Sequence, residues 1–175
     1  MLLTCVRAVR SLAAQRGLEL HYRHAGAELL FRGDEGLIRR MILNLLDNAI
    51  KYTPAGGRIC VDLGREEAGY AVRVADTGRG IPAEAQPHIF ERFYRVDQAR
   101  SHSGEADGSG AGLGLSIAAW VAEAHGGRIT LDRSDQRGST FLISLPVSVE
   151  TGGGQPDHPL ISSCSVIGRT TSSER

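Results

Sequence analysis

The stretch Asp34-Glu-Gly-Leu-Ile-Arg-Arg-Met-Ile-Leu-Asn-Leu-Leu-Asp-Asn-Ala-Ile-Lys-Tyr52 decides the fold class, because it predicts a long amphipathic helix. Asp34 is a favourable N-cap, and the Thr-Pro-Ala-Gly-Gly segment at 53–57 ends the helix. Two predicted strands, 58–63 and 70–75, follow with no helix between them. A helix followed by paired strands is typical of an α+β fold and departs from the strict βαβ alternation of a doubly wound sheet.

The flanking segments extend this mixed pattern. Residues 1–16 predict a helix, and residues 18–22 and 28–32 predict short strands. A Gly-rich turn at 76–82 and an irregular, mobile loop at 83–111 precede a helix at 112–125 and strands at 128–132 and 140–145. We therefore expect a two-layer α/β sandwich, in which helices cover one face of a mostly antiparallel mixed sheet. The Ser-, Thr- and Gly-rich residues 148–175 predict a disordered tail.

Composition excludes several classes of function. The chain has 20 basic and 20 acidic residues, so it offers no net charge for nucleic acid or an anionic membrane. The sequence contains no run of 18 apolar residues, so it predicts no membrane span. The cysteines Cys5, Cys60 and Cys164 are odd in number and widely spaced, which fits a reducing cytosol without a disulfide framework. Glycine is frequent, 22 of 175 residues, which favours special turns or close approach of backbone to a ligand.

One face of the helix at 34–52 carries groups suited to a metal polyphosphate. At 100° per residue, Asn44, Asn48 and Lys51 fall within a sector of about 60°. Amide oxygens are good Mg²⁺ ligands, and a lysine neutralises phosphate. A solvated polar face is the alternative interpretation of this pattern. The opposite face is apolar and predicts the core-facing side: Ile38, Ile42, Leu45, Leu46 and Ala49.

Two Gly-rich segments add ligand-binding features. In the first, Asp76-Thr-Gly78-Arg-Gly80-Ile-Pro82, a strand delivers a carboxylate that accepts hydrogen bonds, as the exocyclic amine of adenine requires. A surface turn begun by an aspartate is the alternative interpretation. In the second, Gly108-Ser-Gly-Ala-Gly-Leu-Gly-Leu-Ser116, alternate glycines leave backbone N–H groups free to surround phosphate at a helix N-terminus. It lacks the Gly-Lys-Ser/Thr of a Walker A loop.

Together these segments resemble the catalytic, ATP-binding domain of sensor histidine kinases. The segment at 44–53 resembles the N box, the segment at 76–82 the G1 box, the segment at 89–95 (Ile-Phe-Glu-Arg-Phe-Tyr-Arg) the F box and the segment at 110–115 the G2 box. Gly138-Ser-Thr140-Phe141 resembles the closing strand motif of the family. The resemblance spans residues 15–146 and implies the Bergerat fold, which gyrase-type and chaperone ATPases share.

The resemblance also implies a role for each matching position. Asn48 with Asn44 would hold Mg²⁺, and Asn44, Asn48, Lys51 and Arg95 would form the catalytic set. Residues 95–111 would be the ATP lid, with Arg95 reaching the γ-phosphate, and Phe90 and Phe93 would anchor that lid. The implied ATP-binding residues are Asn48, Lys51, Tyr52, Asp76, Gly78, Gly80, Ile81, Arg95, Gly110, Gly112, Leu113, Gly114, Leu115 and Thr140.

Asn44 bears on whether the domain transfers or hydrolyses phosphate. Hydrolytic relatives place a glutamate there as a base for water, and an amide cannot act as one. We therefore expect an ATP- and Mg²⁺-dependent protein-histidine kinase of a two-component system. None of the six histidines is followed by an acidic residue, as the family's acceptor would be. The acceptor is thus expected on a separate dimerisation domain, in cis or in trans, with a response regulator as the indirect partner.

These inferences divide the chain into three expected regions. Residues 1–16 would be the remnant of a link to the dimerisation domain, residues 17–147 the catalytic domain and residues 148–175 the tail. The expected location is the cytoplasm, as a soluble protein or as the cytoplasmic part of a membrane-bound kinase. Three alternatives stay open: a regulatory nucleotide-binding module, a Bergerat-fold ATPase or anti-sigma-type serine kinase, and, more distantly, a Rossmann dehydrogenase.

Overall fold

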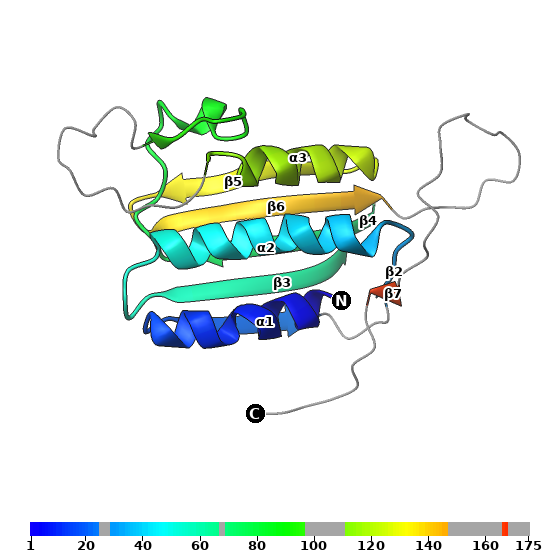
Figure 1. Ribbon diagram of the computed structural model, residues 1–175, viewed down its shortest axis with the longest axis horizontal. Helices are drawn as coiled ribbons and strands as arrows, with labels where there is room; N and C mark the ends of the chain where they lie inside the picture. The colour runs from blue at the N-terminus through cyan, green and yellow to red at the C-terminus, as the bar shows by residue number, and fades with distance from the viewer. Residues whose placement is uncertain (25–28, 67–68, 97–110, 147–165, 168–175) are drawn as a thin grey trace, which may run out of the picture.

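The computed structural model describes residues 1–24, 29–66, 69–96, 111–146 and 166–167 (Figure 1). Helical and strand segments alternate irregularly along the chain, as the sequence predicts. In order, they are α1 (Leu2–Gln15), β1 (Glu19–His24), β2 (Leu29–Leu30), α2 (Glu35–Tyr52), β3 (Arg58–Glu66), β4 (Gly69–Asp76), η1 (Gln86–His88), α3 (Gly114–Ala124), β5 (Arg128–Asp135), β6 (Gly138–Pro146) and β7 (Val166–Ile167).

The principal sheet has five strands in the order β1-β3-β4-β6-β5. β1 and β3 run parallel, and every other neighbouring pair in this sheet is antiparallel. The three α-helices lie side by side across one face of the sheet (Figure 1). The predicted α+β sandwich with a mostly antiparallel mixed sheet is therefore confirmed.

Helix α2 forms the centre of the helical layer, and its ends follow the predicted signals. The Asp34 carboxylate accepts a hydrogen bond from the backbone N–H of Leu37 at 2.9 Å, as an N-cap should. At the other end, the Thr53 hydroxyl donates to the carbonyl of Ala49 at 2.6 Å. The apolar face of α2 is buried against the sheet and the neighbouring helices. Its buried residues are Ile38, Met41, Ile42, Leu45, Leu46, Ala49 and Ile50. The opposite face is therefore left for ligands.

Helix α1 belongs to the same hydrophobic core. Its residues Leu2, Cys5, Val6, Val9 and Ala13 are buried, and the helix packs against α2 and β1. Burial raises the pKa of the Cys5 thiol. The link from this helix to a preceding dimerisation domain stays a prediction.

Three predictions outside the main sheet differ from the structure or fall outside it. The predicted strand at 28–32 is reduced to Leu29–Leu30, which pairs antiparallel with β7 and not with the principal sheet. Within the predicted loop at 83–111, η1 is a short helical piece, and residues 97–110 lie outside the described residues. The predicted disordered tail also lies outside the described residues, except for the two residues of β7.

A histidine joins the helical layer at one end. The backbone N–H of Asp34 donates to Nε2 of His125 at 3.1 Å, and Nδ1 of His125 lies 2.7 Å from the carbonyl of Val121. Because Nε2 accepts and a carbonyl can only accept, the ring is neutral with its proton on Nδ1. His125 therefore connects the N-cap of α2 to the last turn of α3.

We expect replacement of His125 by alanine to lower the free energy of unfolding by about 1–3 kcal/mol. The Asp34 N–H would lose its hydrogen-bond acceptor, and the Phe31 ring would lose the ring that packs beside it. The measurement is urea unfolding followed by circular dichroism. His88 is exposed and provides the control, since its replacement by alanine should change stability by no more than about 0.5 kcal/mol. Equal unfolding midpoints for the two variants would contradict the connecting role.

No helix of the described residues is both long and apolar enough to cross a membrane.

Candidate nucleotide-binding site

A large cavity opens between the exposed face of α2 and the segments that follow β4. Its volume is about 690 Å³. Its walls come from α2, the turn after β4, the segment 89–96, the start of α3 and strand β6. The structure brings most of the sequence-predicted site residues to this one cavity: Asn44, Asn48, Lys51, Tyr52, Asp76, Gly80, Ile81, Arg95, Gly112, Leu113, Gly114 and Leu115 line it.

Helix α2 contributes a continuous polar stripe to the cavity. Arg40, Asn44, Asp47, Asn48 and Lys51 all line it, at spacings that place them on one helical face. The Nδ2 atom of Asn44 is buried and has no hydrogen-bond partner in the described part of the chain. Buried amides are normally paired, so this N–H donor is one that an acceptor oxygen of a ligand or of a water would satisfy. The predicted ligand-binding face of the helix is thus the face that borders the cavity.

Asp76 lies at the opposite wall, at the end of β4. Its Oδ1 atom accepts from the backbone N–H of Gly78 at 2.8 Å and from that of Ser139 at 3.3 Å. Burial raises the pKa of Asp76 above the usual value, and the two backbone hydrogen bonds oppose that shift. Oδ2 makes no hydrogen bond within the described residues, so this oxygen is left to accept one from a ligand.

Two glycines let the turn after β4 pack directly on the β5–β6 hairpin. Gly80 has φ +69°, and a Cβ there would lie 2.0 Å from the carbonyl oxygen of Asp135. Gly138 has φ +125°, and a Cβ there would lie 1.9 Å from the carbonyl oxygen of Asp76. Any side chain at either position would drive the two segments apart. The wall of the cavity beside Asp76 therefore depends on both glycines.

The segment 89–96 borders the cavity beside the start of α3. Phe90 packs edge-on against Phe141 of β6, with ring centroids 6.4 Å apart. The Phe93 N–H donates to the carbonyl of Gly112 at 3.0 Å, while the Phe93 side chain is 63% exposed. Phe93 thus contacts the start of the G2 segment through its backbone and leaves its ring on the surface. Residues 97–110, which include Gly110 and all of the predicted lid (95–111) except its ends, lie outside the described residues.

Two predicted site residues do not line the cavity. Gly78 acts through its backbone N–H, which positions the Asp76 carboxylate. Thr140 is placed by strand alternation on the other face of the sheet, because Ser139 and Phe141 on either side of it line the cavity. The predicted ATP-binding residue Thr140 therefore does not line this cavity, whereas its neighbour Ser139 does.

The structure adds cavity residues that the motifs did not identify. Ser139 follows from the alternation of β6, whereas Arg40 and Asp47 follow from the helical spacing of Asn44 and could have been found from it. Burial raises the pKa of Asp47. Arg79 stacks over the Tyr52 ring at 4.9 Å from its centroid, and no sequence signal indicated that contact.

The charge of the cavity suits an anion. Among the described residues that line it, five are cationic, namely Arg16, Arg40, Lys51, Arg79 and Arg95, and two, Asp47 and Asp76, are acidic. Within a concave site, such an excess of one sign attracts ligands of the opposite sign. The cavity therefore combines a positively charged region with a hydrogen-bond-accepting carboxylate, the pattern that an adenine nucleotide requires.

The fold and the site together define an ATP-binding domain of the Bergerat type. Residues 33–149 match the model of the family described as "Histidine kinase-, DNA gyrase B-, and HSP90-like ATPase". The chain belongs to this family.

Named relatives place it among the catalytic domains of sensor histidine kinases. The sensor histidine kinase RppB of Synechocystis sp. is 40% identical over 136 residues, which cover 78% of this chain and 29% of RppB. The structure of full-length ShkA in complex with AMPPNP has 29% identity and a TM-score of 0.70, over 83% of this chain and 29% of that one. The mycobacterial sensor histidine kinase MprB has 30% identity and a TM-score of 0.63, over 82% and 93%. The chain spans less than a third of the length of the curated relatives RppB, SilS and CusS.

Proposed function

We propose that this domain transfers the γ-phosphate of ATP to a histidine on a separate dimerisation and phosphoacceptor domain, in a two-component system that ends in a response regulator. In this step the bond from the γ-phosphorus to the bridging oxygen of ADP breaks, and a bond to the imidazole nitrogen forms. The proton of that imidazole leaves to a base on the acceptor domain or to water. The proposed place of this reaction is the cytoplasm.

The observation that carries this proposal is the stripe of α2 opposite Asp76. The free Oδ2 of Asp76 would accept the N6 amine of adenine, which leaves the triphosphate to extend toward α2. Lys51 and Arg95 line the same cavity and would neutralise the phosphate oxygens. The N-terminus of α3 and the backbone of Gly112 and Leu113 would supply N–H donors to them.

The donor set of α2 fits a magnesium ion. No group of three or more His, Cys, Asp or Glu side chains suited to a metal exists among the described residues, so a metal here would rely on amides and phosphates. Asn44 and Asn48 both line the cavity, and their amide oxygens are the ligands that would bind the ion. The unpaired Nδ2 of Asn44 is a donor and would instead pair with a phosphate oxygen or a water. When bound, Mg²⁺ would neutralise charge on the transferred phosphoryl group.

Asp47 supports a second candidate, acceptor-free ATP hydrolysis. Asn44 stands where hydrolytic relatives carry their base, and it cannot accept a proton, but Asp47 is a carboxylate on the same cavity-lining stripe. Release of phosphate without any acceptor, lost on replacing Asp47 by asparagine, would favour this ATPase over the kinase.

The test of the proposed function is phosphoryl transfer in trans. The protein is mixed with γ-labelled ATP, Mg²⁺ and the isolated acceptor domain of a related sensor kinase, and acid-labile, base-stable label on that domain is followed. We expect label that disappears when the acceptor histidine is replaced by glutamine. ATP binding with no transfer to any of several acceptor domains would instead support a regulatory nucleotide-binding module.

A further inference from the structure

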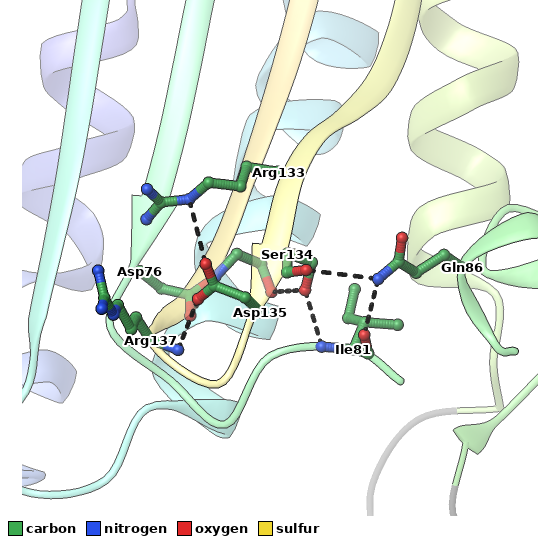
Figure 2. Close-up of polar contacts among 8 residues, drawn as sticks. Asp76, Ile81, Gln86, Arg133, Ser134, Asp135 and Arg137 are labelled. Atoms are coloured by element: carbon green, nitrogen blue, oxygen red, sulfur yellow. Dashed lines mark hydrogen bonds and ion pairs between the residues drawn. The ribbon is translucent and has the colours of Figure 1, made fainter. Parts of the chain in front are cut away.

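A chain of hydrogen bonds runs behind the base-binding end of the cavity (Figure 2). The backbone N–H of Ile81 donates to Oγ of Ser134 at 2.8 Å. The hydroxyl of Ser134 lies 3.0 Å from the hydroxyl of Ser139. The backbone N–H of Ser139 in turn donates a hydrogen bond to Oδ1 of Asp76. Ser134 thus connects the turn after β4 to the strand that carries the other wall of the site.

Gln86 provides a second connection at the same place. Its Nε2 donates to the carbonyl of Ile81 at 2.9 Å and lies 3.5 Å from the carbonyl of Ser134. The backbone N–H and the carbonyl of Ile81 are therefore both hydrogen-bonded, the N–H to Ser134 and the carbonyl to Gln86. Figure 2 shows these side chains converging on Ile81 from β5 and from η1.

Three residues of this chain, Asp76, Ile81 and Ser139, border the cavity. Ser134 and Gln86, which hold them from behind, are absent from the lining of the cavity. Ser139 is 5% exposed, so its hydroxyl relies on Ser134 or on a bound ligand for hydrogen bonding. Since Ser134 Oγ already accepts from Ile81, its own proton is available to Ser139.

We propose that Ser134 is a positioning residue that sets the selectivity of the site for the adenine base. By holding Ile81 and Ser139 at once, it fixes the two walls on either side of Asp76 and orients the Ser139 hydroxyl. The proposal rests on the proposed ATP binding and deepens it. Gln86 assists by holding the carbonyl of Ile81.

Selectivity between ATP and inosine triphosphate tests this role. The two nucleotides differ at the base edge, where inosine has a carbonyl in place of the adenine amine, and they share the triphosphate. For Ser134→Ala we expect the affinity for ATP, measured by calorimetry, to fall about 3- to 10-fold, the loss that one net hydrogen bond produces. The affinity for inosine triphosphate should change much less, so the ratio of the two affinities falls.

A merely structural role would lower both affinities together and leave their ratio unchanged. Ser134→Thr keeps the hydroxyl and should restore the wild-type ratio. The matched control is Arg133→Gln on the same strand, whose side chain instead pairs with Asp135 at 3.9 Å and should leave the ratio unaltered. In a Ser139→Ala background, Ser134→Ala should lower the ratio less than it does in the wild type, because the part of its effect that acts through the Ser139 hydroxyl is already lost while its contact with Ile81 remains to be lost.

The outcomes separate this inference from the proposed function. A wild-type protein that binds no ATP overturns the proposed function itself. A wild type that binds ATP, with an unchanged selectivity ratio in Ser134→Ala, overturns only the role of Ser134. Should Ser134→Ala fail to fold, Ser134→Cys retains the size of the side chain with weaker hydrogen bonding and carries the same expectation.

Discussion

Replacing Asp76 by asparagine is expected to abolish ATP binding without unfolding the protein. Both backbone hydrogen bonds to Asp76 end on Oδ1, and the amide oxygen of asparagine can accept the same two bonds. The NH₂ group would then occupy the place of Oδ2, where it would meet the N6 amine of adenine donor to donor. We expect a loss of affinity of at least about 100-fold, the effect of losing a charge-assisted hydrogen bond and leaving a donor unpaired.

The same substitution should leave stability unchanged or raise it at neutral pH. Burial raises the pKa of Asp76 in the folded protein above its unfolded value. Its contribution to stability is therefore fully present below the unfolded pKa and is lost as the pH rises through the folded pKa. At pH 7 the folded protein bears the cost of a buried charge, and the neutral asparagine removes that cost.

Calorimetry with ATP and thermal unfolding at pH 7 measure the two effects side by side. Asp132→Asn, at an exposed carboxylate on β5, is the matched control and should change neither. In the wild type, ATP affinity should also weaken on acidification, beginning at a higher pH than for an aspartate of ordinary pKa. Normal ATP affinity in a folded Asp76→Asn protein would contradict the assignment of Asp76 to the base.

The layers of the fold and one side of the site could be predicted because they follow from local periodicity. The helical spacing of apolar and polar residues along 34–52 placed Ile42 and Leu46 in the core and Asn44 and Asn48 on the cavity side. The same rule would have identified Asp47. Helical spacing needs no information from distant parts of the chain, which is why this wall of the site could be predicted from the sequence.

The parts that escaped prediction depend on contacts between distant segments. The choice between Ser139 and Thr140 needs the face of β6 that meets the helices, which the pairing of the whole sheet determines. The contacts of Ser134 with Ile81 and of His125 with Asp34 join segments 53 and 91 residues apart. Each uses a residue type that is ordinary on a surface, so no local pattern distinguishes it.

The pairing of β2 with β7 is a further contact of this kind. Leu29 and Leu30 are opposite Ile167 and Val166, far along the chain and within a stretch whose composition predicts disorder. A two-residue pairing has almost no sequence signal, because any short apolar pair can supply it. Composition therefore describes the average of residues 148–175 and not each short piece of them.

Asn48→Ala is expected to have the second large effect, on phosphoryl transfer and on its dependence on Mg²⁺. Asn48 lies one turn after Asn44 on the cavity face of α2, where its amide oxygen would bind the metal. We expect transfer to the acceptor domain to fall at least about 100-fold, comparable to removal of one group that stabilises transition-state charge.

A binding measurement separates metal binding from a general loss of structure. In the wild type, Mg²⁺ should strengthen ATP binding, and in Asn48→Ala calorimetry should find nearly equal affinities with and without Mg²⁺. Alanine is the better helix former, so a folding defect is not expected. Arg39→Ala, at an exposed α2 position that does not line the cavity, should keep the Mg²⁺ effect. If Mg²⁺ strengthened ATP binding equally in Asn48→Ala and in the wild type, the metal would have to be held elsewhere, and the polar stripe of α2 would serve the phosphates alone.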